Sequence, residues 1–129
     1  MDAQLDSLKL DSNGLIPAIV QDADNGQILM MAWMNRAALD KTIETGTVHT
    51  YSRSRGRLAQ KGESSGHLQH VVRILTDCDR DVILIQAKQD VAACHEGYRS
   101  CFYRQYQPEK GDWKIIAEKV FDPGKVYHK

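Results

Sequence analysis

The chain has 129 residues, and its 17 basic and 17 acidic side chains give a formal net charge of zero. This length is enough for one domain with a real core but not for two, so we expect a single domain over residues 1–129. The neutral charge disfavours nucleic acids and anionic membranes as partners, and the absence of a long apolar stretch or a signal-like start makes the cytoplasm the expected location.

The first half of the chain predicts a hairpin and then one clear helix. Residues 15–21 and 27–33 are rich in apolar side chains and have the length of strands. The turn signal Asp24–Gly26 lies between them, and its Asn and Gly tolerate positive φ. Asn35 can cap the helix that follows, and Gly46 can end it. We therefore expect a strand, a turn, a strand and a helix in this order.

The second half predicts further strands joined by irregular segments. Residues 52–66 are rich in Gly, Ser, Arg and Lys, which is typical of a long loop or a ragged hairpin. Because most connections are too short for a crossover, antiparallel pairing is favoured. The expected fold class is α+β, mainly β, as a small antiparallel-rich domain with one clear helix. The further strands are expected at 47–52, 67–76, 82–87, 101–106 and 113–121.

A short acidic segment is the most informative chemical motif. In it Asp77, Asp79 and Asp81 alternate with Cys78 and Arg80. If the segment is extended, the three carboxylates point to one face and the thiol to the other. Carboxylate oxygens suit Mg²⁺, whereas thiolates suit zinc, so one segment can serve two metals. The alternative is an acidic turn that faces solvent, although a cation would relieve the repulsion among three carboxylates.

The three cysteines of the chain are Cys78, Cys94 and Cys101. They contain no C-x-x-C pair, which argues against a structural zinc site with four closely spaced ligands. Three thiolates and one open position would suit a catalytic zinc with water as its fourth ligand. The alternative is that all three are small buried apolar side chains. His95, beside Cys94, is a further candidate ligand or a general base, and otherwise a structural or surface histidine.

Between residues 52 and 66 positive charge is combined with hydroxyl groups and glycines. Arginine forks, serine hydroxyls and backbone N–H groups freed by glycine are what phosphate binding uses, although the order of a Walker loop is absent. Glu63 is an acidic residue within this basic segment, and it can orient a guanidinium or accept a hydrogen bond from a ribose hydroxyl. The alternative is a solvated basic loop. The candidate substrate-binding residues are Arg53, Arg55, Lys61, Glu63 and Ser64.

Taken together, these motifs resemble the phosphoribosyl-AMP cyclohydrolase family of histidine biosynthesis. They agree with it in order and spacing from about residue 14 to residue 104, which leaves 105–129 as a C-terminal extension. One departure is Ala59, at a position where the family usually has an aromatic residue. The matching segments are Pro17–Asp22, Met31–Asn35, Tyr51–Arg55, Lys61–Gly66, Asp77–Asp81, Ala93–Gly97 and Ser100–Phe102.

The resemblance implies an enzyme that hydrolyses the N1–C6 bond of the adenine ring of 1-(5-phosphoribosyl)-AMP. It implies an intertwined homodimer, and the extension is too short for the pyrophosphohydrolase domain that some relatives carry. His95 is the candidate to move the proton in this reaction. The implied zinc ligands are Cys78, Cys94 and Cys101, with Cys78 facing the other two across the dimer. The implied Mg²⁺ ligands are Asp77, Asp79 and Asp81.

Three other classes of function stay open at this point. A zinc nucleobase deaminase also directs hydroxide at purine C6, but it needs H-x-E and P-C-x-x-C motifs that this chain lacks. A non-catalytic, metal-stabilised interaction module would have closed four-ligand zinc sites. A nucleic-acid binder would use the basic loop, and the neutral charge argues against it.

Overall fold

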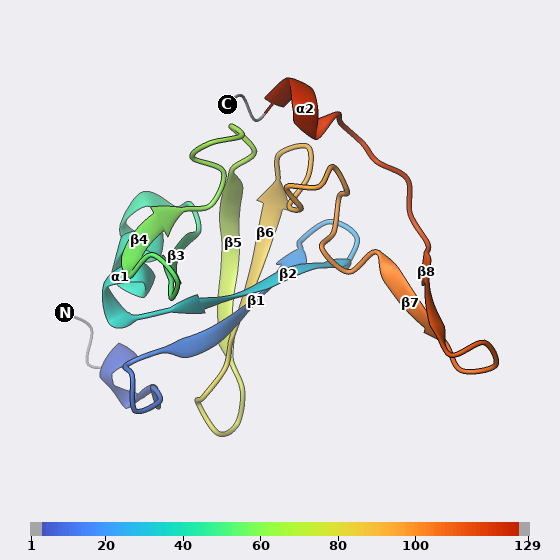
Figure 1. The fold of residues 1–129 in the computed structure, drawn as a ribbon. Coiled ribbons are helices and arrows are strands. Elements are labelled where there is room, and N and C mark those ends of the chain that lie inside the picture. Colours follow the sequence, from blue (N-terminus) through green and yellow to red (C-terminus); the bar gives the residue numbers. More distant parts are fainter. Residues whose placement is uncertain (1–3, 127–129) are drawn as a thin grey trace.

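A computed structural model describes residues 4–126, and it confirms the expected mainly β fold with one clear helix (Figure 1). The central sheet has four strands in the order β2-β1-β6-β5. Two small two-stranded sheets, β3/β4 and β7/β8, lie on either side of it. The central strands are β1 (Ile16–Asp22), β2 (Ile28–Met34), β5 (Gln69–Thr76) and β6 (Ile83–Gln89).

The predicted hairpin and its turn are confirmed at the start of the sheet. β1 and β2 pair antiparallel, and Gly26 takes the positive φ of 78° that the turn requires. The Asp22 carboxylate accepts hydrogen bonds from the N–H groups of Asp24 (2.8 Å) and Asn25 (3.4 Å). A short 3₁₀ helix, η1 (Leu5–Ser7), precedes this hairpin.

The helix α1 (Arg36–Thr45) begins and ends where its capping residues predict. The Asn35 side chain accepts a hydrogen bond from the Ala38 N–H (2.8 Å), and Gly46 ends the helix with φ 74°. The buried side of α1 carries Ala38, Leu39 and Thr42, which pack against the sheet. The helix therefore fixes where the following hairpin starts.

β1 and β6 pair in parallel, which is an exception to the predicted antiparallel arrangement. The pair is possible because β2, α1, the β3/β4 hairpin and β5 all lie between the two strands in sequence, which is long enough for a crossover. Both strands are inner strands, and Val20 and Ile85 are fully buried where they pair. β6 therefore runs through the core and carries a loop at each end.

The two small hairpins lie at the periphery. The first joins β3 (His49–Ser52) to β4 (Arg57–Gln60), and the second joins β7 (Arg104–Gln107) to β8 (Asp112–Ile115). The predicted strand at 113–121 is wrong beyond Ile115, because the four residues of β7 offer β8 no further partners. The chain instead returns across the molecule to the short helix α2 (Pro123–Val126), as Figure 1 shows.

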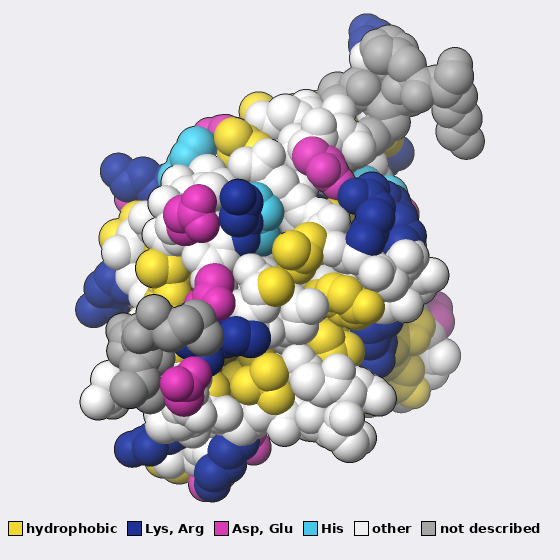
Figure 2. All heavy atoms as spheres, turned by 90° about the vertical axis from the view of Figure 1, so that its left-hand side faces the viewer, with side chains coloured by type: hydrophobic (Ala, Val, Ile, Leu, Met, Phe, Trp, Pro, Cys, Tyr) yellow, Lys and Arg dark blue, Asp and Glu magenta, His cyan; other side chains and the backbone are white. Residues whose placement is uncertain are grey.

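Figure 2 shows the face that carries α1 and the β3/β4 hairpin. Basic and acidic side chains are interspersed on this face, with small apolar areas between them. Within residues 4–126, no helix is both long enough and apolar enough to span a membrane.

Candidate active site

The cysteine loop, residues 90–103, follows β6 and brings two of the three thiols together. The Cys94 N–H donates to the Tyr98 carbonyl oxygen (3.2 Å), which folds the loop back on itself. The Cys101 N–H donates to the Leu29 carbonyl oxygen (2.7 Å), which ties the returning part of the loop to β2. Two cysteines that are seven positions apart therefore meet because both are anchored by backbone hydrogen bonds.

The side chains of Cys94 and Cys101 interact directly. Cys94 is buried, and Cys101 lies at the surface. Loss of hydration and the neighbouring Cys94 thiol raise the pKa of Cys101 to about 11, against the opposing charge of Lys61. A metal ion binds the thiolate, so a zinc ion that binds here would displace the proton. The pair fits a zinc site as two of its ligands.

A buried ion pair fixes the cysteine loop to the sheet. The Arg99 guanidinium donates to the Asp22 carboxylate (2.6 Å) and to the carbonyl oxygens of Gln89 (3.0 Å) and Val91 (2.8 Å). Asp22 is only 2% exposed. Burial alone would raise its pKa, but the hydrogen bonds from Arg99 and from the turn lower the pKa of Asp22 overall. Sequence reasoning missed this pair, although Asp22 belongs to a matching segment and Arg99 lies between two others.

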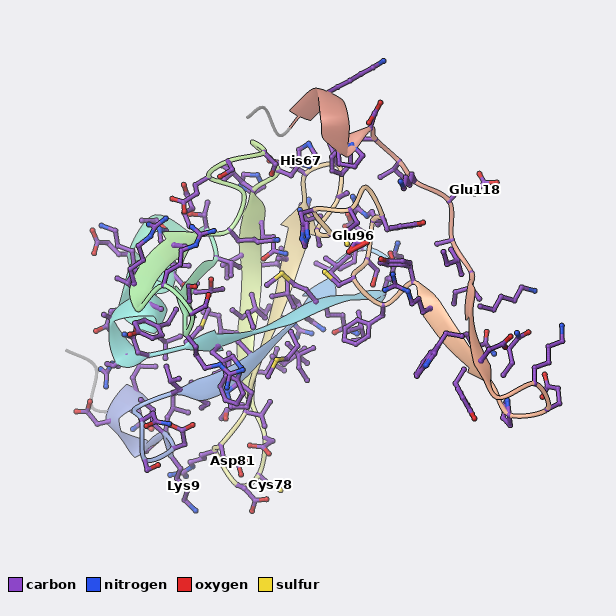
Figure 3. The ribbon with its side chains drawn as sticks, viewed as in Figure 1. Lys9, His67, Cys78, Asp81, Glu96 and Glu118 are labelled. Atoms are coloured by element: carbon purple, nitrogen blue, oxygen red, sulfur yellow. The ribbon has the colours of Figure 1, made fainter. Side chains whose placement is uncertain are left out.

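The acidic turn, residues 77–81, joins β5 to β6 at the opposite end of β6 from the cysteine loop (Figure 3). Its three aspartates offer oxygen atoms within 4.8 Å of one another, and within residues 4–126 they are the only group of three candidate ligands at that spacing. The hydrogen bond with Asp77 and repulsion from the other two carboxylates raise the pKa of Asp81. A divalent cation would relieve this repulsion, so the turn fits a hard metal ion.

Cys78 lies in the acidic turn and is exposed. Figure 3 shows Cys78 and Asp81 at one end of the sheet and Glu96, in the cysteine loop, at the other. One copy of the chain therefore brings together Cys94 and Cys101, but not all three predicted zinc ligands.

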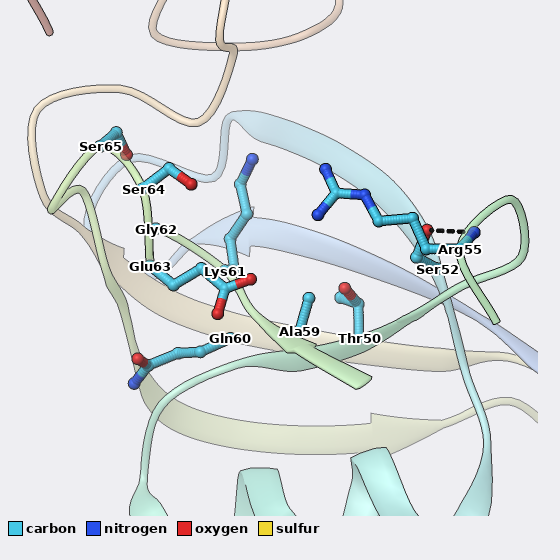
Figure 4. Close-up of a pocket in the computed structure, with 10 residues that line it drawn as sticks. All are labelled: Thr50, Ser52, Arg55, Ala59, Gln60, Lys61, Gly62, Glu63, Ser64 and Ser65. Carbon is cyan, nitrogen blue, oxygen red and sulfur yellow. Dashed lines mark hydrogen bonds between the residues drawn. The ribbon is translucent and has the colours of Figure 1, made fainter. Parts of the chain in front are cut away.

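The β3/β4 hairpin and the residues after it form a polar pocket of about 200 Å³ (Figure 4). Four of the five predicted substrate-binding residues line it: Arg55, Lys61, Glu63 and Ser64. Figure 4 shows the charged ends of Arg55 and Lys61 extending to the same side of the hairpin. Ala59 also lines the pocket, so an aromatic residue at that position would fill part of it. Such a pocket suits a phosphate group.

The fifth predicted residue, Arg53, lies elsewhere. Its guanidinium stacks over the Trp33 ring at 4.7 Å from the ring centre, and it is absent from the described residues that line the pocket. Glu63 lies 3.7 Å from the Arg57 guanidinium, which agrees with the expectation that it orients an arginine. Both of these contacts are at the surface.

A larger groove of about 770 Å³ begins where the polar pocket ends. Arg55 and Ser64 line both, so the two hollows are neighbours. The groove contains His95 and Glu96 from the cysteine loop and Lys119 from the returning chain. It therefore places the exposed imidazole of His95 between a basic, hydroxyl-rich pocket and the loop that carries the thiol pair.

Comparison with known proteins agrees with this site. The family model described as phosphoribosyl-AMP cyclohydrolase matches residues 30–103. A phosphoribosyl-AMP cyclohydrolase of Methanococcoides burtonii is 58% identical over 95% of this chain and 98% of its own length. The cyclohydrolase of Nitratidesulfovibrio vulgaris strain DP4 is 56% identical over 90% of this chain and 91% of its own length. That of Pelotomaculum thermopropionicum is 52% identical over 100% of this chain and 99% of its own length. The chain belongs to the phosphoribosyl-AMP cyclohydrolase family.

The extent of the family match bears on the site. Residues 30–103 include the polar pocket, the acidic turn and the cysteine loop. The C-terminal extension at 105–129 lies outside the cyclohydrolase model, yet the similarity to the Pelotomaculum protein includes it. The returning chain that lines the groove is therefore part of what this chain shares with a cyclohydrolase relative.

Proposed function

We propose that this protein hydrolyses the adenine ring of 1-(5-phosphoribosyl)-AMP between N1 and C6, a step of histidine biosynthesis. One observation carries the proposal: the match to phosphoribosyl-AMP cyclohydrolases covers residues that line the polar pocket and the neighbouring groove, and it also covers the thiol pair. Water adds at C6 and the N1–C6 bond breaks. The water oxygen becomes the carbonyl oxygen of a carboxamide at C6, and the exocyclic amine stays as its nitrogen.

Cys94 and Cys101 would hold a zinc ion together with Cys78 of the partner subunit. The fit rests on two neighbouring thiols whose protons a metal would displace, and on a third thiol that one copy cannot supply. Three protein ligands leave a fourth position open. When bound, zinc would supply Lewis-acid activation of water at neutral pH.

The residues that line the groove and the polar pocket would transfer the proton and bind the substrate. His95 lines the groove beside the thiol pair, so it takes the proton from the attacking water and returns it to N1. Arg55 and Lys61 bind a phosphate group, and the Ser64 hydroxyl donates a further hydrogen bond to it. Glu63 stands at the same pocket and accepts a hydrogen bond from a ribose hydroxyl. Arg53 keeps a weaker role, since its guanidinium is held over Trp33.

A homodimer follows from the same argument. The incomplete thiol set requires a second copy, and the β7/β8 hairpin with the chain after it leaves large apolar side chains in water. Trp113 is 65% exposed, and Ile115, Ile116 and Val120 are each more than half exposed. Apolar surface of this kind favours association. We infer that the two copies exchange these parts in an intertwined dimer.

The acidic turn would then join the same active site. Cys78 lies between Asp77 and Asp79, so a copy that contributes its thiol to the partner's groove also brings its aspartates there. Mg²⁺ held by Asp77, Asp79 and Asp81 would be placed near the phosphates, where it can bind one of them or orient the substrate. The cytoplasmic location and the single domain over 1–129 stay predictions.

The test is a ring-opening assay on the purified protein with its metal content measured by elemental analysis. We expect the ultraviolet absorbance of the substrate to change as the ring opens, with no ammonia released. Stripping the metals with a chelator should abolish this change, and adding zinc should restore it. Release of ammonia would instead indicate a deaminase, and the absence of any reaction by the metal-loaded protein would refute the proposal.

A further inference from the structure

The C-terminal segment, residues 116–126, returns to the body of the molecule and crosses the cysteine loop (Figure 1). The Val120 N–H donates to the Gly97 carbonyl oxygen (2.8 Å). The Phe121 ring meets the His67 ring edge-on, with the ring centres 4.8 Å apart. The segment is therefore attached on both sides of the groove, to the cysteine loop and to the residues that follow the polar pocket.

Gly97 is the position at which this contact is closest. Its φ is +104°, and a Cβ atom there would lie 2.8 Å from the Phe121 carbonyl oxygen and 3.3 Å from the side chain of Lys119. Atoms do not approach so closely without a shift of backbone, so only glycine allows the segment to lie against the loop in this way. The aliphatic stem of Lys119 consequently rests on the backbone of Gly97.

Lys119 forms part of the wall of the groove. It lines the groove with Arg55, Ser64 and His95, whereas its neighbour Glu118 points away from the body of the molecule (Figure 3). Among the described residues, no carboxylate lies within ion-pair distance of the Lys119 ammonium group, although its charge acts on the nearby Glu96. A lysine whose stem is packed and whose charge faces a groove has a different environment from a lysine that only solvates a surface.

The substrate of the proposed function carries two phosphate groups, one at each end, and the polar pocket with Arg55 and Lys61 accounts for one of them. The geometry points to Lys119 as the binding residue for the second phosphate, so the C-terminal segment forms one wall of the substrate site. This inference rests on the proposed function. It assigns to the extension a part in binding a phosphomonoester dianion, for which a lysine supplies a compact positive charge.

The experiment compares Lys119→Ala with Lys41→Ala, which removes the same charge from the exposed face of α1, outside the groove. We expect Lys119→Ala to raise KM about tenfold with little change in kcat, because it removes one charged hydrogen bond to the phosphate. Lys119→Arg should restore most of the affinity, and Lys41→Ala should behave as wild type. Calorimetric titration of substrate onto a zinc-free sample should give the same change in Kd.

The outcomes separate this inference from the proposed function. A KM and Kd of Lys119→Ala within twofold of wild type, or equal to those of Lys41→Ala, would overturn the role of Lys119 while leaving the reaction in place. If the wild type binds the nucleotide without opening its ring, the proposed reaction fails and the Kd values still decide on Lys119. If the wild type neither binds nor opens it, both fail. Unchanged circular dichroism and melting temperature will show that the variants are folded.

Discussion

The two ends of β6 carry two candidate metal sites that are built in different ways. At one end, the acidic turn gathers three carboxylates within a single copy, because residues 77–81 fold into one short turn in which the Asp81 N–H donates to the Asp77 carboxylate (3.0 Å). At the other end, the cysteine loop brings together only two thiols, and it does so through contacts with β1 and β2. The acidic turn depends on local sequence alone, whereas the thiol pair depends on contacts with distant strands and, in the dimer that we propose, on a second copy as well.

The largest effect is expected from a substitution in the cysteine loop. Cys94→Ser removes a thiolate from the proposed zinc site and leaves the acidic turn intact. Because a Lewis acid supplies several kcal/mol of transition-state stabilisation, we expect turnover to fall by more than about 10³-fold, together with loss of zinc. Elemental analysis and the ring-opening assay measure the two effects on the same sample. Near-normal turnover in this variant would remove zinc from the mechanism.

Mixing two inactive variants tests whether the ends of β6 meet across a dimer. Cys78→Ser should also be inactive, since in the proposed dimer its thiol would complete the site of the other copy. When Cys78→Ser and Cys94→Ser are unfolded and refolded together, half of the dimers are mixed, and each mixed dimer has one intact site. About a quarter of the wild-type activity should then return, as two-fold symmetry requires. If mixing restores nothing, a site shared between copies is wrong.

The next largest effect distinguishes the contribution of the His95 imidazole from that of the proposed zinc ion. His95→Ala should lower kcat by about 10²-fold if His95 moves the proton, while the zinc content stays at the wild-type value. His70→Ala is a matched control, because His70 is exposed on β5 and contacts Asp90 at 3.0 Å outside the groove. An unchanged kcat for His95→Ala would return His95 to a structural role.

The parts of the structure that local sequence determines could be predicted, and the parts that depend on distant segments could not. The hairpin turn at Gly26 and the limits of α1 are set by residues within a few positions of one another, and the predictions for them are confirmed. The acidic segment is also local, but it forms a turn with Arg80 at φ 59°, so the extended arrangement with alternating faces is wrong. The parallel pairing of β1 with β6 depends on segments far apart in the chain, and the short connections gave no sign of it.

At the cysteine end, spacing indicated which residues carry chemistry but not what holds them. Asp22 was noted only as the last residue of the matching segment Pro17–Asp22, although its carboxylate caps a turn and binds Arg99. Arg53 was grouped with the phosphate-binding residues because it belongs to a basic, serine-rich loop, yet its guanidinium stacks over the ring of Trp33 in β2. Lys119 lies beyond the recognised motifs, and only the return of the chain after β8 brings it to the groove.

A moderate effect is expected from the buried ion pair that holds the cysteine loop. Asp22→Asn should lower the free energy of unfolding by about 2 kcal/mol at pH 7, since it breaks a buried pair whose arginine is partly hydrated. The folded-state pKa of Asp22 is lowered, so the stabilisation is present above its unfolded pKa and is lost as pH falls through the folded value. Urea unfolding of both proteins between pH 7 and pH 3 should show the difference closing below about pH 4. A difference that stays constant with pH would contradict the role of the charge.

The smallest effect is expected at the acidic turn. Asp79→Asn removes one charge from the acidic turn, and we expect it to weaken Mg²⁺ binding by about tenfold without changing the zinc content, because Mg²⁺ is held through carboxylate charge. Asp24→Asn is the control, since this exposed aspartate in the β1/β2 turn uses only its backbone N–H in the hydrogen bond to Asp22. If Asp79→Asn also removed zinc, the two ends of β6 would form one inseparable site in the dimer. Zinc retained together with weakened Mg²⁺ binding would establish that the acidic turn binds its own ion, separate from the zinc site.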